Sequence, residues 1–274
     1  VYKRQVLSDL ERAYELFSSA KDFDGDPILG GSISKWKKAT TAFQLKVLMH
    51  LSKKESDVDL NVKERFARIV ASGSLMESND DNLQMKYADK ANTVYPFHNT
   101  NTKHAGYAML STMLIDKFKA TGDIRMFYYA KPAKAKLNEG VTADSWDAYI
   151  GTDPSLPFEQ IEKAYATEQY SGFNARYTDY PSGEPVVRLG YAEQNFILAE
   201  AAVRGWISGD ASAYYKKAIR AHMEFIASNT PDEEVYHHGH PITEEAIAAF
   251  LETPAIQLSG EKEADIEKLS LIHI

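Results

Sequence analysis

Apolar side chains recur every three or four residues in several stretches of the chain, and this spacing is typical of helices with one buried face. Two such stretches lie near the N-terminus, at about 7–20 and 34–53, and a shorter one lies at 62–72. Ser32 or Ser34 can cap the second helix, because a serine hydroxyl accepts a hydrogen bond from a free amide of the first turn. The buried face of this helix is expected to consist of Trp36, Ala39, Phe43 and Val47.

A second pair of helices is predicted towards the C-terminus, at about 189–205 and 210–228. Asp210 follows Gly209 and can cap the second helix of this pair. Both helices carry small residues on the sides that would face each other, and the turn between them is short. This arrangement matches the tetratricopeptide unit, so we expect the two helices to pack antiparallel.

The pattern changes between residues 79 and 188, where turn-forming residues crowd together and only short helices, such as 108–121, are predicted. Long irregular segments on a compact scaffold usually carry function. The sequence therefore predicts a mainly α protein with tetratricopeptide-like helix pairs, a large irregular loop region and few short strands.

Composition narrows the range of functions. The 274 residues are 44% apolar and 26% charged, which is ordinary for a globular protein. The net charge of −8 gives no electrostatic reason to expect nucleic acid or an anionic membrane surface as a partner. The chain has no cysteine, which excludes disulfides, thiolate metal sites and a cysteine nucleophile. No apolar run approaches the ~20 residues that a membrane-spanning helix requires.

Catalytic and metal-binding motifs are weak. A glycoside hydrolase needs two carboxyl groups held about 5–9 Å apart across a cleft, and no such pair can be identified in the sequence. The histidine group 237–240 lies between prolines and is expected to be an exposed loop rather than a zinc site. Asp22, Asp24 and Asp26 alternate as in a calcium loop, but Pro27 and Ile33 stand where that loop needs glycine and glutamate. We therefore predict no catalytic residue, no metal and no cofactor.

Aromatic and polar residues alternate in two loops of the irregular region. The stretch 95–101 places rings beside amides, and a second group precedes Gly151. Sugar recognition uses this mixture, because sugar C–H faces stack on rings while hydroxyls bond to amides and carboxylates. The alternative is that these rings only anchor the loops to the scaffold. The predicted ligand-binding residues are Tyr95, Phe97, Asn99, Trp146 and Tyr149.

Several segments carry motifs that occur together in one known family. The stretch 30–38 is a glycine-rich turn that runs into Lys-Trp-Lys-Lys, and it is followed by 121–125 with 129–133, by the stretch from Tyr191 to Trp206, and by 211–221. In this order the segments resemble the SusD/RagB family of Bacteroidetes, and most closely its second SusD-like branch. Residues 121–133 are similar to the family's Asp-Pro-Arg segment and following strand, with Ile124 in place of proline, and the last two segments resemble its most recognisable helix and the helix after it.

The resemblance implies a single SusD-like domain over 1–274, with a helical scaffold at 7–78, an irregular ligand-binding region at 79–188 and a helix pair with loops at 189–268. It also implies a non-enzymatic, surface-exposed lipoprotein of the outer membrane. Such a protein binds glycans, or other nutrients such as peptides, and delivers them to a SusC-like TonB-dependent transporter. The competing hypotheses are a tetratricopeptide-like scaffold that binds proteins, and a glycoside hydrolase.

The chain is expected to be an incomplete piece of its parent. It begins at Val1, and its extreme ends, 1–5 and 269–274, resemble translated sequencing-adapter read-through. The lipidated cysteine and the N-terminal helices implied by the resemblance are missing, so any membrane contact would come from an anchor outside this chain. Because neighbouring helices would cover its apolar faces, we expect the isolated chain to be marginally stable.

Overall fold

The computed structural model describes residues 2–101 and 108–270, which form two compact units. Among the described residues, the first unit comprises 2–85, 186–222 and 257–270, and the second comprises 86–101, 108–185 and 223–256. Helix α10, Ala211–Ser228, begins in the first unit and ends in the second. The second unit thus combines most of the irregular segment with residues that sequence analysis grouped with the C-terminal helix pair.

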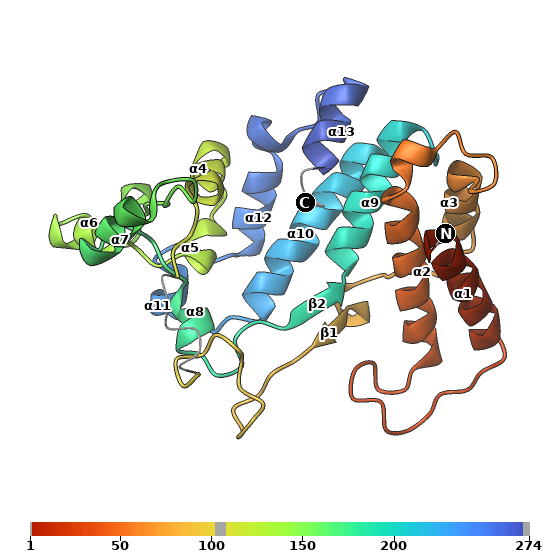
Figure 1. Cartoon of the computed structure of the whole chain (residues 1–274), viewed down its shortest axis with the longest axis horizontal. Coiled ribbons are helices and arrows are strands. Elements are labelled where there is room, and N and C mark those ends of the chain that lie inside the picture. Colours follow the sequence, from red (N-terminus) through yellow and green to blue (C-terminus); the bar gives the residue numbers. More distant parts are fainter. Residues whose placement is uncertain (1, 102–107, 271–274) are drawn as a thin grey trace. The chain divides into compact units, whose positions relative to one another are not determined.

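The first unit is built from long helices (Figure 1). Helices α1 and α2 lie side by side, and α2 also contacts α3 and α9, while α13 packs on α9. The buried apolar residues where these helices meet include Leu45, Leu48, Phe66, Leu198 and Trp206. The helices have the bounds α1 Tyr2–Phe17, α2 Ile33–Met49, α3 Val62–Ala71, α9 Tyr191–Arg204 and α13 Lys262–Ser270.

A two-stranded antiparallel sheet completes the first unit. Strand β1, Leu83–Met85, pairs with β2, Val186–Leu189, with Leu83 opposite Leu189 and Met85 opposite Val186. The sheet therefore joins the point where the chain leaves this unit to the point where it returns.

The loop between α1 and α2 is organised by one carboxylate. Asp26 accepts backbone N–H bonds from Ile28, Leu29 and Gly31, and the indole N–H of Trp36 donates to it at 2.9 Å. These hydrogen bonds, led by the one from Ile28, lower the pKa of Asp26. The acidic loop is a helix connection held by its own backbone, as the sequence indicated.

The expected C-terminal helix pair is present as α9 and α10. Gly205 ends α9 in the left-handed conformation, with φ of 74°, and the Asp210 carboxylate accepts the Ser212 N–H at 2.9 Å at the start of α10. The rings of Phe196 and Tyr215 meet with centroids 5.8 Å apart, which brings the two helices together. The prediction of a mainly α protein with few short strands is confirmed.

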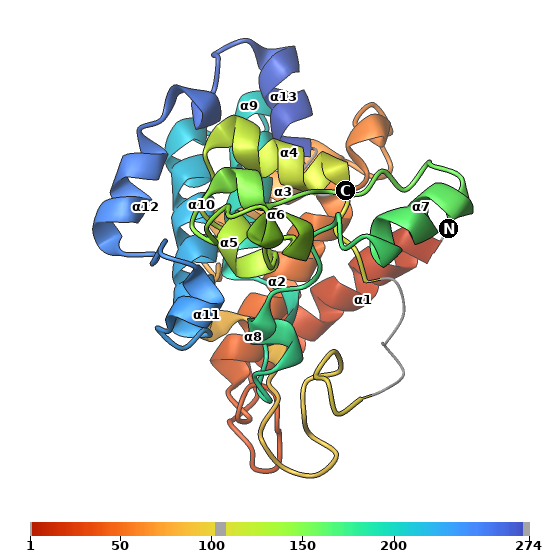
Figure 2. The same ribbon diagram turned by 90° about the vertical axis from the view of Figure 1, so that its left-hand side faces the viewer.

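Short helices and long loops make up the second unit. Its core contains Ile115, Met126, Phe127, Ala148 and Tyr149. Helices α4 and α5 lie next to each other in both views (Figures 1 and 2). The helices are α4 Thr112–Thr121, α5 Met126–Tyr129, α6 Lys134–Asn138, α7 Phe158–Ala166, α8 Ala175–Thr178, α11 Glu234–His237 and α12 Glu244–Leu251. Single 3-10 turns occur at Ser52–Lys54, Asn79–Asp81, Trp146–Ala148 and Pro254–Ile256.

Both ends of the described chain belong to helices. Helix α1 begins at Tyr2, and Leu269, near the end of α13, is fully buried. The segments that sequence analysis set aside are thus partly built into the fold. No helix among residues 2–101 and 108–270 combines the length and the apolar character needed to cross a bilayer.

One predicted core position is wrong. Phe43 of α2 is 39% exposed, whereas Leu45 and Leu48 are fully buried. The buried face of α2 instead includes Thr40 and Thr41, whose hydroxyls donate to the carbonyls of Trp36 and Lys37, four residues earlier. A threonine can be buried in a helix at little cost when its hydroxyl bonds back to the preceding turn. A prediction that places only apolar side chains on the buried face therefore put that face at the wrong positions of α2.

We predict that Leu45→Ala and Phe43→Ala differ clearly in their effect on stability. Removing a fully buried leucine leaves a cavity and should lower the free energy of unfolding by about 2–5 kcal/mol, whereas truncating a ring on the surface should cost less than about 1 kcal/mol. Urea denaturation followed by circular dichroism measures both. Equal losses would place Phe43 in the core after all.

Candidate functional site

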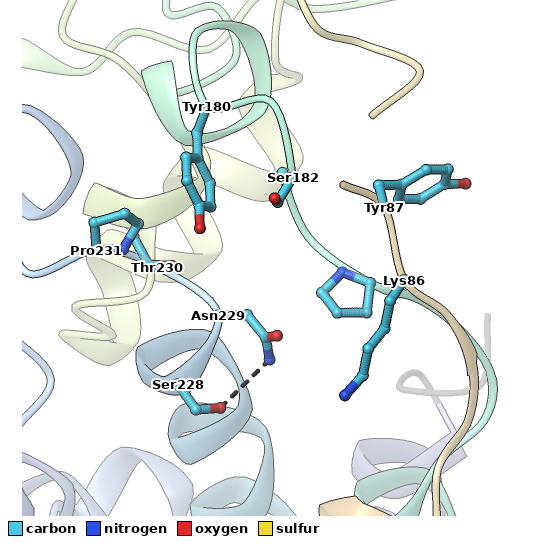
Figure 3. Close-up of a pocket in the computed structure, with 10 residues that line it drawn as sticks. Lys86, Tyr87, Tyr180, Ser182, Ser228, Asn229, Thr230 and Pro231 are labelled. Atoms are coloured by element: carbon cyan, nitrogen blue, oxygen red, sulfur yellow. Dashed lines mark hydrogen bonds between the residues drawn. The ribbon is translucent and has the colours of Figure 1, made fainter. Parts of the chain in front are cut away.

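The second unit contains a pocket of about 300 Å³ (Figure 3). One wall comes from the loop after α8, the opposite wall comes from the end of α10, and a third comes from the segment after β1. The side chains of Tyr180, Ser182 and Asn229 point into the same space, and Lys86 extends along its edge. The lining residues are Lys86, Tyr87, Tyr180, Ser182, Gly183, Pro185, Ser228, Asn229, Thr230 and Pro231.

The first wall is a four-residue turn, Tyr180-Pro181-Ser182-Gly183. The Gly183 N–H donates to the Tyr180 carbonyl at 2.9 Å, which closes the turn. Proline in the second position and glycine in the fourth are the residues that a type I turn favours. The sequence of this turn therefore determines how Tyr180 and Ser182 are presented to the pocket.

The turn lies against the ring of Tyr95. The Tyr95 N–H donates to the Pro181 carbonyl at 2.8 Å. Gly183 has φ of +50°, and a Cβ atom there would stand only 2.2 Å from Tyr95 Cγ. Burial, with Glu184 nearby, raises the pKa of the Tyr95 hydroxyl to about 12. The Tyr95 ring thus packs directly against the turn, and only glycine can occupy position 183 beside it.

The opposite wall follows from the way α10 ends. Past Ser228 the chain reaches Pro231, which cannot continue a helix. The Asn229 amide nitrogen donates to the Phe225 carbonyl at 2.7 Å, and the Thr230 hydroxyl donates to the Ile226 carbonyl at 2.8 Å. Both side chains are held by the last turn of the helix, and the amide oxygen of Asn229 is left for the pocket.

Several polar groups of the pocket have no hydrogen-bond partner among the described residues. They are the Tyr180 hydroxyl, the Ser182 hydroxyl, the Lys86 ammonium group and the Asn229 amide oxygen. Together they offer donors and acceptors beside the ring of Tyr180, which suits a ligand rich in hydroxyl groups. None of the described lining residues is an aspartate, a glutamate or a histidine, so the pocket offers no carboxyl pair or imidazole for acid–base chemistry.

Two of the predicted ligand-binding residues are core residues. Tyr95 is 7% exposed and Tyr149 is 1% exposed. The Tyr149 hydroxyl donates to the Ala143 carbonyl at 2.8 Å, and its ring meets Phe127 edge-on at 5.1 Å. A ring buried to this degree has no face open to a ligand. In this structure both tyrosines anchor loops, which was the alternative considered from the sequence.

The other three predicted residues are more accessible. Phe97 is 39% exposed and its ring lies 5.4 Å from that of Phe173, while Trp146 is half-buried and meets the Phe127 ring at 4.8 Å. The Asn99 side chain donates to the Asp179 carboxylate at 3.2 Å. Phe97 and Trp146 belong to separate ring groups, and none of the five predicted residues lines the pocket. Their contact with a ligand stays a prediction.

Sequence reasoning missed Lys86, Tyr180, Ser182 and Asn229. A signal for two of them was present, because Tyr180-Pro181-Ser182-Gly183 is an aromatic residue in a polar turn, the same kind of pattern that drew attention to 95–101. No comparable signal marked Lys86 or Asn229. They reach the pocket only because segments far apart in the sequence meet there.

The histidine group is not an exposed loop. His238 is buried, and its Nε2 atom lies 3.3 Å from the Asn174 amide nitrogen. Burial lowers the pKa of His238, which favours the neutral ring that can accept this bond. The His240 ring stacks on Phe127 at 3.7 Å. His238 and His240 therefore pack against neighbouring side chains, and within the described ranges no group of three potential metal ligands occurs.

Comparison with known proteins supplies independent information. The SusD-like family model described as starch-binding, associating with outer membrane, matches residues 1–271. None of the curated proteins matches the chain. The chain is similar to a SusD homologue from Bacteroides fragilis, with 95% sequence identity and a TM-score of 0.95. That match covers 97% of this chain and 56% of the homologue.

Two further solved structures share the fold. A protein from Bacteroides vulgatus, described as a candidate outer-membrane protein for nutrient binding, has 32% identity and a TM-score of 0.83, covering 98% of this chain and 58% of that one. A chitin-binding SusD homologue from Flavobacterium johnsoniae has 18% identity and a TM-score of 0.64, covering 82% of this chain and 44% of that one. The chain therefore spans little more than half the length of the more similar relatives.

We predict that Gly183→Ala is far more damaging than Gly140→Ala. Both glycines have positive φ, but a Cβ atom at Gly140 would meet nothing within 4 Å. Gly140→Ala should therefore cost only the backbone strain of about 1–2 kcal/mol, whereas Gly183→Ala adds a clash with the Tyr95 ring. Thermal and urea unfolding measure the difference. Equal losses would mean that the turn can move off the ring.

Proposed function

The chain belongs to the SusD-like family, and from this premise we propose that its pocket binds a hydroxyl-rich nutrient, most simply an oligosaccharide. The observation that carries the proposal is the convergence of Tyr180, Ser182 and Asn229, each with an unused hydrogen-bonding group, on one space of about 300 Å³. The ring of Tyr180 can stack on the C–H face of a sugar while the other groups bond to its hydroxyls.

The proposed role is binding without catalysis. Hydrolysis of a glycosidic bond needs two carboxyl groups on either side of that bond. The described residues that line the pocket include none. A glycoside hydrolase is therefore the less favoured reading of this site.

We extend the proposal to the parent protein as a whole. It would stand on the cell surface as a lipoprotein of the outer membrane and pass its ligand to a SusC-like TonB-dependent transporter. The family description, the nutrient-binding description of the Bacteroides vulgatus protein and the chitin-binding homologue with the same fold support this extension. Co-purification of the full-length parent with the transporter barrel is the corresponding test, and its absence from the purified transporter would argue against delivery.

The exposed residues predicted from the sequence are kept as secondary contacts. Phe97, Asn99 and Trp146 are accessible enough to touch the outer part of a longer ligand. Tyr95 and Tyr149 are proposed to act only indirectly, through the loops that they anchor.

We predict that Tyr180→Ala lowers the affinity for a bound oligosaccharide by about tenfold or more. A stacked ring contributes ~1 kcal/mol beyond its buried area, and ~1.4 kcal/mol corresponds to a factor of ten. Tyr180→Phe keeps the ring and should lose less. Isothermal titration with maltoheptaose and chitohexaose measures the effect, and circular dichroism checks the fold of each variant.

Tyr165→Ala is the matched control, since Tyr165 is a partly exposed tyrosine of the same unit that does not line the pocket. Phe97→Ala and Trp146→Ala test the secondary contacts in the same titrations. Unchanged affinity in a folded Tyr180→Ala protein would remove the pocket as the binding site. Release of shorter sugars from either oligosaccharide would overturn the non-catalytic reading.

A further inference from the structure

Arg176 is the largest fully buried side chain among the described residues, with 0% exposure. Its Nη2 atom lies 2.8 Å from a carboxylate oxygen of Glu184, and its Nη1 atom donates to the Tyr177 hydroxyl at 2.9 Å. The guanidinium group also lies over the Tyr177 ring, 4.8 Å from its centre. The contact with Glu184 is an ion pair without the alignment of a hydrogen bond, and Arg176 Nε has no partner among the described residues. Arginine is almost never buried so completely unless it is paired.

Stability alone does not explain this ion pair. Removing two charges from water is costly, and apolar residues of similar volume often stabilise a protein as well as a buried pair or better. The best-attested use of such pairs is to select one conformation over others. Because Arg176 and Glu184 flank the turn 180–183, the conformation that this pair would select is that of the turn.

The two charged residues flank the pocket turn along the chain. Arg176 belongs to α8, and Glu184 directly follows Gly183. Between them lie Tyr180 and Ser182, which face the pocket. The ion pair therefore closes the base of the loop whose tip carries the ligand-binding groups. Glu184 itself points to Arg176 and is not among the residues that line the pocket.

The side chain of Asn174 holds the backbone of Arg176 in place. The side-chain oxygen of Asn174 accepts the Arg176 N–H at 2.8 Å, and its nitrogen donates to the Phe127 carbonyl at 2.7 Å and to the Tyr236 carbonyl at 3.0 Å. Asn174 is fully buried. Arg176 is thus connected through Asn174 to the core of the unit. The Glu184 carboxylate therefore pairs with a guanidinium group whose position is fixed.

A neighbouring segment holds the same loop from its other side. The backbone N–H groups of Tyr95 and Asn99 donate to the carbonyls of Pro181 and Thr178, at 2.8 and 2.7 Å. Within the turn, the Gly183 N–H donates to the Tyr180 carbonyl. Hydrogen exchange at the amides of Tyr95, Asn99 and Gly183 therefore reports whether the loop is in place.

We propose that Arg176 and Glu184 are positioning residues, which keep the Tyr180–Gly183 turn in its ligand-binding conformation without touching the ligand. The inference rests on the proposed function of the pocket. A turn that is already ordered loses less conformational freedom when a ligand binds, so the ion pair acts on affinity through pre-organisation. Its loss should loosen the turn selectively rather than the whole unit.

The test compares Glu184→Gln, the double variant Arg176→Met with Glu184→Leu, and the control Glu168→Gln, which removes a solvent-exposed ion pair with Lys134 in the same unit. Hydrogen exchange is measured on the full chain without ligand. We expect exchange at Tyr95, Asn99 and Gly183 to rise at least tenfold in Glu184→Gln. Exchange at Ile115 and in the rest of α4 should stay unchanged, and the control should match the wild type.

The double variant separates positioning from plain stability. It removes both charges, so its thermal stability should recover towards that of the wild type, while the three amides should still exchange at least tenfold faster. Recovery of both stability and protection would overturn the proposal. So would unchanged exchange at these amides in Glu184→Gln.

Titration with maltoheptaose and chitohexaose then tests the link to binding. Affinity should fall about tenfold or more in both pair variants and stay unchanged in the control. The proposed function of the pocket fails if the wild type binds neither sugar, or if Tyr180→Ala binds them as well as the wild type does. In either case the exchange measurements still decide whether Arg176 and Glu184 position the turn. Wild-type affinity in variants with a loosened turn would overturn the link to binding.

Discussion

The side-chain amide of Asn174 joins three segments of the second unit. Its oxygen caps α8, and its nitrogen donates to one carbonyl within α5 and one within α11. This unit has few long helices, so many backbone groups lack a partner in regular structure and must find one in a side chain. A fully buried amide with donors and an acceptor on one rigid plane can meet several of them at once. The pocket turn begins only a few residues beyond this anchor.

Aromatic residues divide into two roles around that anchor. Rings such as Tyr95, Tyr149 and Phe127 are buried and supply the apolar contacts that a loop-rich unit cannot obtain from helix faces. Tyr180 is different, because its ring lies at the pocket and its hydroxyl is unused by the described residues. The same residue type thus forms part of the core and lines the pocket, and burial distinguishes the two positions.

The arrangement suits capture of a ligand more than its chemical conversion. Binding needs groups held still, whereas acid–base catalysis also needs carboxyls or imidazoles with tuned pKa values. Near the pocket turn, the Glu184 carboxylate is paired to Arg176 and the His238 ring is packed against Asn174. If the pocket binds its proposed ligand, a rigid turn would favour affinity by reducing the conformational freedom lost on binding.

The sequence by itself determined the elements whose information is local. Periodic apolar residues and capping side chains predicted α1, α2, α3 and the α9–α10 pair, because helix faces and caps depend on neighbours three or four positions away, whereas α13 was not predicted. Family motifs, also read along the chain, indicated the family. The roles of Phe43, Tyr95, Tyr149 and His238 were decided only by tertiary structure. Whether a ring or imidazole is buried depends on segments far away in sequence, and so does the pocket, where residues near 86, 180 and 229 meet.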